Sequence, residues 1–179
     1  MPDASAPSLP PSRGVAIWGV LGVGLLLLQA VVRLTPIALE PFVHGGGLTP
    51  LQAAIYVGWV VTSLYTEGYR GFQKAFVPRT VARAFHLPSV GRPLLSALAP
   101  AFCMGLIHAK RRRLITSWTI VLAIVTAVVL VRRLPSPWRA VVDGGVVAGL
   151  VYGIVALGLA FRRALRGSIP VYPLDLPNG

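Results

Sequence analysis

The feature that most constrains this chain is a set of long uncharged runs, each bordered by basic residues. Leu114 to Val131 contains eighteen residues without a charged side chain, with "KRRR" before it and "RR" after it. Gly14 to Val32 is a second run, of nineteen residues. A helix of about 20 apolar residues crosses the roughly 30 Å hydrocarbon core of a bilayer. These runs therefore predict an integral membrane protein.

Composition and charge agree with this prediction. Hydrophobic residues make up 55% of the chain and charged residues only 12%, and a soluble domain needs more polar surface. The formal net charge is +12. A nucleic-acid-binding protein spreads such charge over a polar surface, whereas here it borders the apolar runs, as in membrane proteins that contact anionic headgroups. We therefore expect membrane lipids, and not nucleic acid, as partners.

Four segments are predicted to cross the membrane within one helical domain, 14–161. The first is too long for the apolar core of a signal peptide and should end near Pro36. The second begins with "TPLQ", in which Thr49 and Gln52 form a capping box. The predicted spans are 14–35, 50–69, 114–131 and 140–161. Residues 1–13 are expected to form a disordered tail, and residues 162–179 the C-terminal tail.

The short apolar segment Pro93 to Ala109 decides how many spans there are, because cytoplasmic loops carry an excess of Lys and Arg. If it does not cross, only four cations lie outside and the other thirteen lie inside; if it crosses, the two sides hold nine and eight. The strong bias favours four spans. The fold class is therefore all-α and polytopic, with a basic amphipathic or re-entrant segment over 70–109.

Five spans remain the alternative. The pattern L-P-S-x-x-R occurs at Leu87 and again at Leu134, each time before an apolar segment that ends in basic residues. A repeat of this kind would make both apolar segments equivalent spans.

The stretch "YTEGYRGFQKAF", Tyr65 to Phe76, carries the most unusual chemistry. On an α-helix, Glu67 shares one face with Arg70 and Lys74, and the aromatic residues form another stripe. Glu67 lies eighteen residues beyond Thr49, about 27 Å along the axis, which predicts a place near the inner interface. We interpret Glu67 as an interfacial acid neutralised by the two cations. An intramembrane proton or ion site is the alternative.

The helical pattern continues past Pro78, with Val77, Val81 and Phe85 on one side and basic residues on the other. An apolar stripe backed by a basic one is typical of a helix lying in the headgroup layer. The predicted headgroup contacts are Arg70, Lys74, Arg79, Arg83, Lys110, Arg111, Arg112 and Arg113.

The last span contains a second acid and a glycine pattern. Asp143 follows Arg139 by one turn, so we expect an interfacial ion pair at the outer side, opposite to Glu67. Small residues recur every three or four positions, which is typical of a helix-packing face within one chain or between copies. These residues are Gly145, Gly149, Gly153 and Ala156.

The leading functional hypothesis is a non-enzymatic structural or accessory protein that contacts anionic lipid, with a homo-oligomer or a membrane-protein partner left open. A small oligomeric transporter or channel subunit using Glu67 or Asp143 is the alternative. A membrane enzyme with Cys103 as nucleophile and His108 as base comes third. We expect no metal and no cofactor, because the three histidines are scattered. The excess of arginine over lysine favours the inner (plasma) membrane of a bacterium.

Overall fold

The computed structural model describes residues 13–43, 47–90 and 93–176, in which every regular element is helical. The predicted tail, apart from Arg13, and part of the first L-P-S-x-x-R match lie outside these ranges. Three elements follow one another without a break and are called the rod: α2 (Pro50–Ser63), η1 (Leu64–Phe76) and α3 (Val77–Val90). The other helices are α1 (Arg13–Val43), α4 (Pro93–Ala97), α5 (Ala99–Cys103), α6 (Arg111–Val131) and α7 (Trp138–Leu165).

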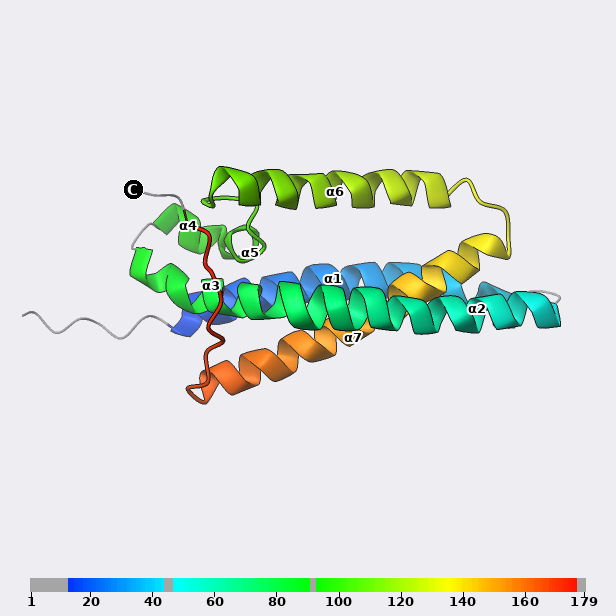
Figure 1. Cartoon of the computed structure of the whole chain (residues 1–179), viewed down its shortest axis with the longest axis horizontal. Coiled ribbons are helices and arrows are strands. Elements are labelled where there is room, and N and C mark those ends of the chain that lie inside the picture. Colours follow the sequence, from blue (N-terminus) through cyan, green and yellow to red (C-terminus); the bar gives the residue numbers. More distant parts are fainter. Residues whose placement is uncertain (1–12, 44–46, 91–92, 177–179) are drawn as a thin grey trace, which may run out of the picture.

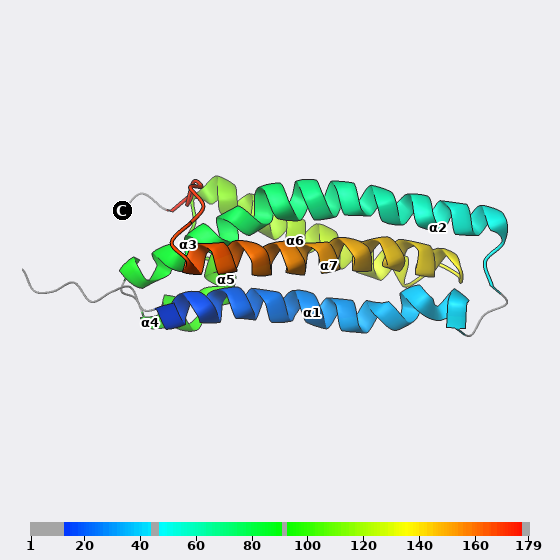
Figure 2. The same cartoon turned by 90° about the horizontal axis from the view of Figure 1, so that it is seen from below.

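Three helices, α1, α6 and α7, are long and apolar enough to cross a membrane. α7 lies between α1 and the rod and contacts both (Figure 2). α6 lies to one side of this group (Figure 1) and packs along none of the other described helices. The sequence prediction of an all-helical fold is thus confirmed for the described residues, and three helices have the length and apolar character that a membrane span requires.

The helix ends gather at two ends of the molecule. The first turns of α1 and α6 lie at the same end as the last turns of the rod and α7 (Figure 1). We call this the cationic end, because it carries most of the arginines. Its members are Arg13, Arg79, Arg83, Lys110, Arg111, Arg112, Arg113, Arg162, Arg163 and Arg166.

The main core lies where α1, α3 and α7 meet. Val23, Val77, Val81 and Leu157 are buried together there, and Phe85 packs against Phe161 of α7 with ring centroids 6.0 Å apart. The apolar stripe of α3 therefore faces protein and not lipid. The expectation that lipid of the headgroup layer covers this stripe is wrong, because an apolar stripe has the same pattern whether lipid or another helix covers it.

α1 continues to Val43, well past Pro36, where the sequence predicted its end. Pro36 removes one helical hydrogen bond, but the neighbouring Thr35 hydroxyl donates to the Val31 carbonyl over 2.7 Å. The Tyr56 hydroxyl of α2 donates to the Ala38 carbonyl over 3.1 Å. These contacts hold the last turns of α1, which shows how bundle packing keeps a helix intact around a proline.

The capping box at the start of α2 is confirmed. The Gln52 backbone N–H donates to the Thr49 hydroxyl over 3.3 Å, and the Thr49 N–H donates to the Gln52 side chain over 3.0 Å. The segment after the rod forms only α4 and α5, each about 7.5 Å long and so too short to cross a membrane. α5 packs closely on α1, where the Pro100 ring occupies the space beside Gly22.

Candidate functional site

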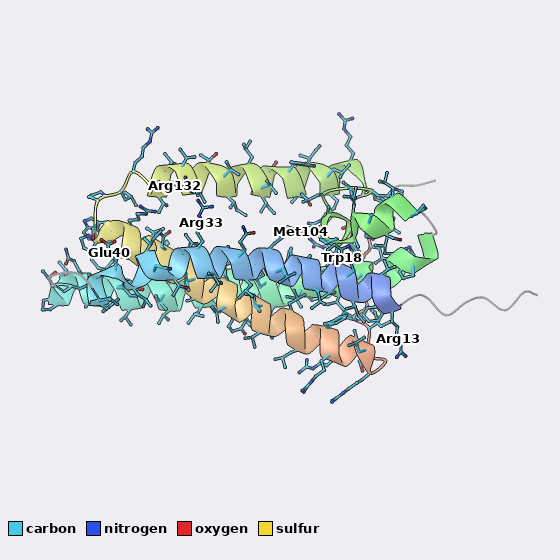
Figure 3. All side chains as sticks on the ribbon, turned by 180° about the vertical axis from the view of Figure 1, so that it is seen from behind. Arg13, Trp18, Arg33, Glu40, Met104 and Arg132 are labelled. Carbon is cyan, nitrogen blue, oxygen red and sulfur yellow. The ribbon has the colours of Figure 1, made fainter. Side chains whose placement is uncertain are left out.

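The exposed cations of the molecule concentrate at the cationic end. Lys110, Arg111 and Arg112 at the start of α6 are exposed, as are the arginines at and just beyond the end of α7. Figure 3 shows Arg13 at this end, whereas Arg132 lies at the opposite end of the molecule. Lys110, Arg111 and Arg112 are thus accessible, and their contact with lipid headgroups stays a prediction.

A cleft of about 400 Å³ lies among these residues. Lys110 to Arg113, Thr116 and Asp175 line it. The backbone carbonyl of Asp175 accepts a 2.7 Å hydrogen bond from the Lys110 N–H, so the C-terminal segment forms part of its wall. The cleft is therefore cationic, with a single acidic residue at its edge.

Two buried donors lie beside this cleft. Arg113 Nε and Ser117 Oγ have no hydrogen-bond partner among the described residues, although Ser117 is only 5% exposed. Both approach Gly105, whose φ of +76° suits glycine; a Cβ there would lie 3.0 Å from Arg113 Nε and 3.3 Å from Ser117 Oγ. Buried polar atoms normally have partners. This pair of donors suits an anionic oxygen.

Arg83 does not belong to this surface, and its predicted headgroup contact is wrong. Its side chain is 0% exposed. It donates to the carbonyls of Phe102 at 2.7 Å, His108 at 3.1 Å and Ile107 at 3.3 Å, and also to Leu174. Its guanidinium lies 4.2 Å from the centre of the Phe102 ring.

Burial lowers the pKa of Arg83 to about 10. The nearby Cys103 raises this pKa, and the positive charge of Arg113 lowers it further. The guanidinium therefore remains charged at neutral pH. It joins α3, the loop before α6 and the C-terminal segment. Arg79 extends this link, because its guanidinium donates to the Tyr172 hydroxyl over 3.1 Å and stacks on the same ring. Sequence reasoning missed these roles, since the acceptors are distant in the chain and carry no motif.

Glu67 lies against the middle of α7. Its carboxylate is 2.9 Å from the position that a Cβ on Gly149 would take, and Phe72 covers Gly153 in the same way. Residues 144–161 of α7 carry no charged side chain, and Gly149 to Gly153 lie near their centre. A bilayer centred on this charge-free stretch would enclose Glu67, whereas the sequence predicts an interfacial location.

The cause lies in η1, which is a π-helix whose backbone hydrogen bonds span five residues and not four. The Thr66 hydroxyl donates to the Thr62 carbonyl at its start, a contact that competes with the regular helical bond. Lys74 lies 4.6 Å from the centre of the Tyr69 ring, five positions earlier, as the wider helix requires.

This widening separates Glu67 from Arg70 and Lys74. Among the described residues, the one ion pair joins Arg139 and Asp143. The prediction that Arg70 and Lys74 neutralise Glu67 is therefore wrong. Arg70 and Lys74 are exposed on the side of η1, level with the middle of α7 and away from the cationic end. The structure therefore does not place these two cations at a headgroup layer.

The small residues of α7 form a contact within the chain. Gly145 meets Trp59 and Ser63 of α2, and Gly149 meets Glu67 of η1. Ala156 packs beside the core that α1 and α3 share with α7. The sequence left open whether this face packs within one chain or between copies, and these contacts lie within one chain.

Asp143 pairs with Arg139 over 3.7 Å, and its side chain is 92% buried. Asp143 and Gly149, which contacts Glu67, are six residues apart on α7, about 9 Å along the axis. Both acids therefore lie in the half of α7 nearer its start. The expectation that they occupy opposite interfaces is wrong.

Cys103 is buried beside Gly19 of α1, and burial raises the pKa of its thiol to about 12. Such a thiol is protonated at neutral pH and is a poor nucleophile. The His108 ring stacks on Phe102, with centroids 6.1 Å apart. Within the described residues, no three His, Cys, Asp or Glu side chains gather as metal ligands would. No family model, curated protein or solved structure matches the chain.

Proposed function

We propose that this protein is a non-enzymatic accessory protein of the bacterial plasma membrane that binds anionic phospholipid through its cationic end. Four spans, α1, the α2–η1 part of the rod, α6 and α7, would alternate in direction across the bilayer. The arrangement in Figure 1 supports this topology, because the connections between these helices alternate between the two ends. Charge bias then places the cationic end in the cytoplasm.

One observation carries the lipid assignment. The cleft of about 400 Å³ is lined by three exposed cations and by Arg113, whose Nε, like the neighbouring Ser117 Oγ, has no hydrogen-bond partner among the described residues. A phosphodiester supplies the anionic oxygens that such donors need, and basic pockets on the cytoplasmic side of membrane helices commonly bind lipid headgroups. The apolar surface of α6 continues from this cleft and would border the acyl chains.

Lipid selection in nanodiscs tests the proposal. The protein is reconstituted with equal amounts of phosphatidylglycerol and phosphatidylcholine, and the lipids retained are counted by native mass spectrometry. Each cation near an anionic surface contributes about 1 kcal/mol, so replacing Lys110, Arg111 and Arg112 with Gln should lower phosphatidylglycerol enrichment by at least about tenfold. Ser117→Ala should lower it by a smaller factor.

The matched control replaces Arg132 and Arg133, exposed cations of the opposite end, with Gln. This variant should keep the enrichment of the unmodified protein. Equal enrichment in the α6 variant, the control and the unmodified protein would remove the lipid assignment.

Ion or proton transport is a second candidate, which the location of Glu67 favours. An acid without an ion-pair partner among the described residues, level with the middle of α7, has the placement of a functional intramembrane group. Flux through liposomes should then fall on Glu67→Gln and persist on Glu40→Gln, at an exposed acid near the end of α1. Absence of acid-dependent flux would remove this candidate.

A further inference from the structure

The exposed cations of η1 lie level with the charge-free stretches of α1 and α7. Two independent helices indicate this level. Phe72 covers Gly153, near the middle of the charge-free stretch of α7, and Val77 belongs to the same buried cluster as Val23, the middle of the charge-free run of α1. Arg70 and Lys74 lie within or next to this interval. A bilayer that encloses α1 and α7 therefore encloses both cations.

Charged side chains at such depth normally face the bundle interior or a partner, because hydrocarbon solvates them poorly. Here both are exposed on the outer side of η1, together with the polar Thr66, whereas Gln73 accepts a hydrogen bond from the Tyr152 hydroxyl of α7. Snorkelling does not solve the problem, since the side chains are much shorter than the distance from the middle of the bilayer to its surface.

No carboxylate in the described part of the chain forms an ion pair with these cations. The carboxylate of Glu67 points to α7, and among the described residues neither Arg70 nor Lys74 takes part in an ion pair. Lys74 has a contact with the Tyr69 ring, which offsets only part of the cost of desolvation. The face therefore has unbalanced positive charge.

We propose that this face, made of Thr66, Arg70 and Lys74, docks a transmembrane helix of a partner protein that carries a carboxylate near its midpoint. Charge complementarity selects this occupant. A second copy of the chain, related by a two-fold axis, would bring the same cations together, and the acids of the described residues are not on this face. The inference depends on the membrane-embedded bundle of the proposed function, but not on lipid selection at the cationic end.

A designed peptide tests this directly. The probe is a Leu/Ala transmembrane peptide of about 21 residues with one central Asp, and its counterpart has Leu at that position. Energy transfer is measured in neutral phosphatidylcholine vesicles between labelled full-length protein and labelled peptide. The Asp peptide should associate roughly tenfold more tightly than the Leu peptide, as polar contacts between membrane helices allow.

Replacing Arg70 and Lys74 with Gln should abolish this preference for the Asp peptide. The matched control, with Arg132 and Arg133 replaced by Gln, loses the same charge at the opposite end and should keep the preference. Equal association of both peptides with the unmodified protein would overturn the proposal. So would energy transfer between two labelled copies of the protein that disappears in the Arg70/Lys74 variant, because the face would then be a self-contact. Neutral vesicles separate this result from anionic-lipid binding.

Discussion

α6 and η1 are both exposed along much of their surface, but they expose opposite chemistry. Beyond its first turn, the outward side chains of α6 are uncharged and mostly apolar, including Ile120, Leu122 and Ile124. Those of η1 include two cations and several polar groups. Hydrocarbon covers the first surface at little cost and the second only at high cost. Whether an exposed side chain of a membrane protein can face lipid therefore depends on whether that side chain is apolar or charged.

The two regions also differ in what holds them. η1 lies in the rod, which packs on α7 through its glycines and is linked to the C-terminal segment by Arg83. α6 is attached mainly near its first turns, where the Trp118 indole donates to the Leu106 carbonyl over 3.3 Å. We therefore expect fold stability to reside in the rod, α1 and α7, and α6 to depend on lipid.

The largest effect should come from Arg83→Met. The change leaves four carbonyl acceptors without their donor inside the protein and should lower the free energy of unfolding by about 3–5 kcal/mol. Thermal unfolding in detergent micelles measures it. Arg112→Met, at an exposed site, should change stability by less than about 0.5 kcal/mol. Equal effects of the two substitutions would mean that the rod is not fixed through Arg83.

Ile124→Arg tests whether lipid covers α6. A cation at the centre of a membrane helix costs about 2.5–3.5 kcal/mol of insertion free energy. The inserted fraction, measured by a glycosylation reporter beyond α6, should fall accordingly, whereas Ile124→Leu should insert fully. Full insertion of the Arg variant would show that α6 faces water or protein instead.

Gly153→Ala tests the contact between α7 and η1. The new Cβ would lie 2.6 Å from Phe72 Cγ, and overpacking of this kind costs about 1–3 kcal/mol. Gly158 on the same helix has open space around it, so Gly158→Ala should be neutral or should stabilise the helix by about 0.5–1 kcal/mol. Thermal unfolding compares the two variants. Identical shifts would contradict the contact between η1 and α7.

The smallest effect is expected for Leu122→Ala. Leu122 is 66% exposed, and its removal leaves no cavity inside the protein. The unfolding free energy in lipid-containing micelles should change by less than about 0.5 kcal/mol. A loss of 2 kcal/mol or more would show that α6 packs against another helix.

Much of the fold could be predicted from local pattern. The charge-free runs predict the long helices, and the capping box at Thr49 locates the start of α2. The apolar stripe of α3 could not be assigned to lipid or protein, because the two environments select the same side chains. The partners of Arg83 are backbone carbonyls far along the chain, which leave no trace in residue type.

The geometry of the acid and cations of η1 was predicted wrongly for a different reason. A uniform rise of 1.5 Å per residue and α-helical spacing were assumed, whereas residues 64–76 form a π-helix and the helices do not start level with one another. The sequence shows that Glu67, Arg70 and Lys74 lie close together in the chain, but it does not show the directions in which the π-helix points their side chains.

Spin-label depth measurement tests the central claim most directly. Labels are attached in lipid bilayers to Arg70→Cys, Leu122→Cys and Arg111→Cys, each in a Cys103→Ala background, and collision with oxygen and with a polar nickel complex is compared. The label at residue 70 should report a depth close to that at residue 122, in the bilayer interior. A label at residue 70 as shallow as that at residue 111 would contradict the account, since η1 would then lie at the headgroups.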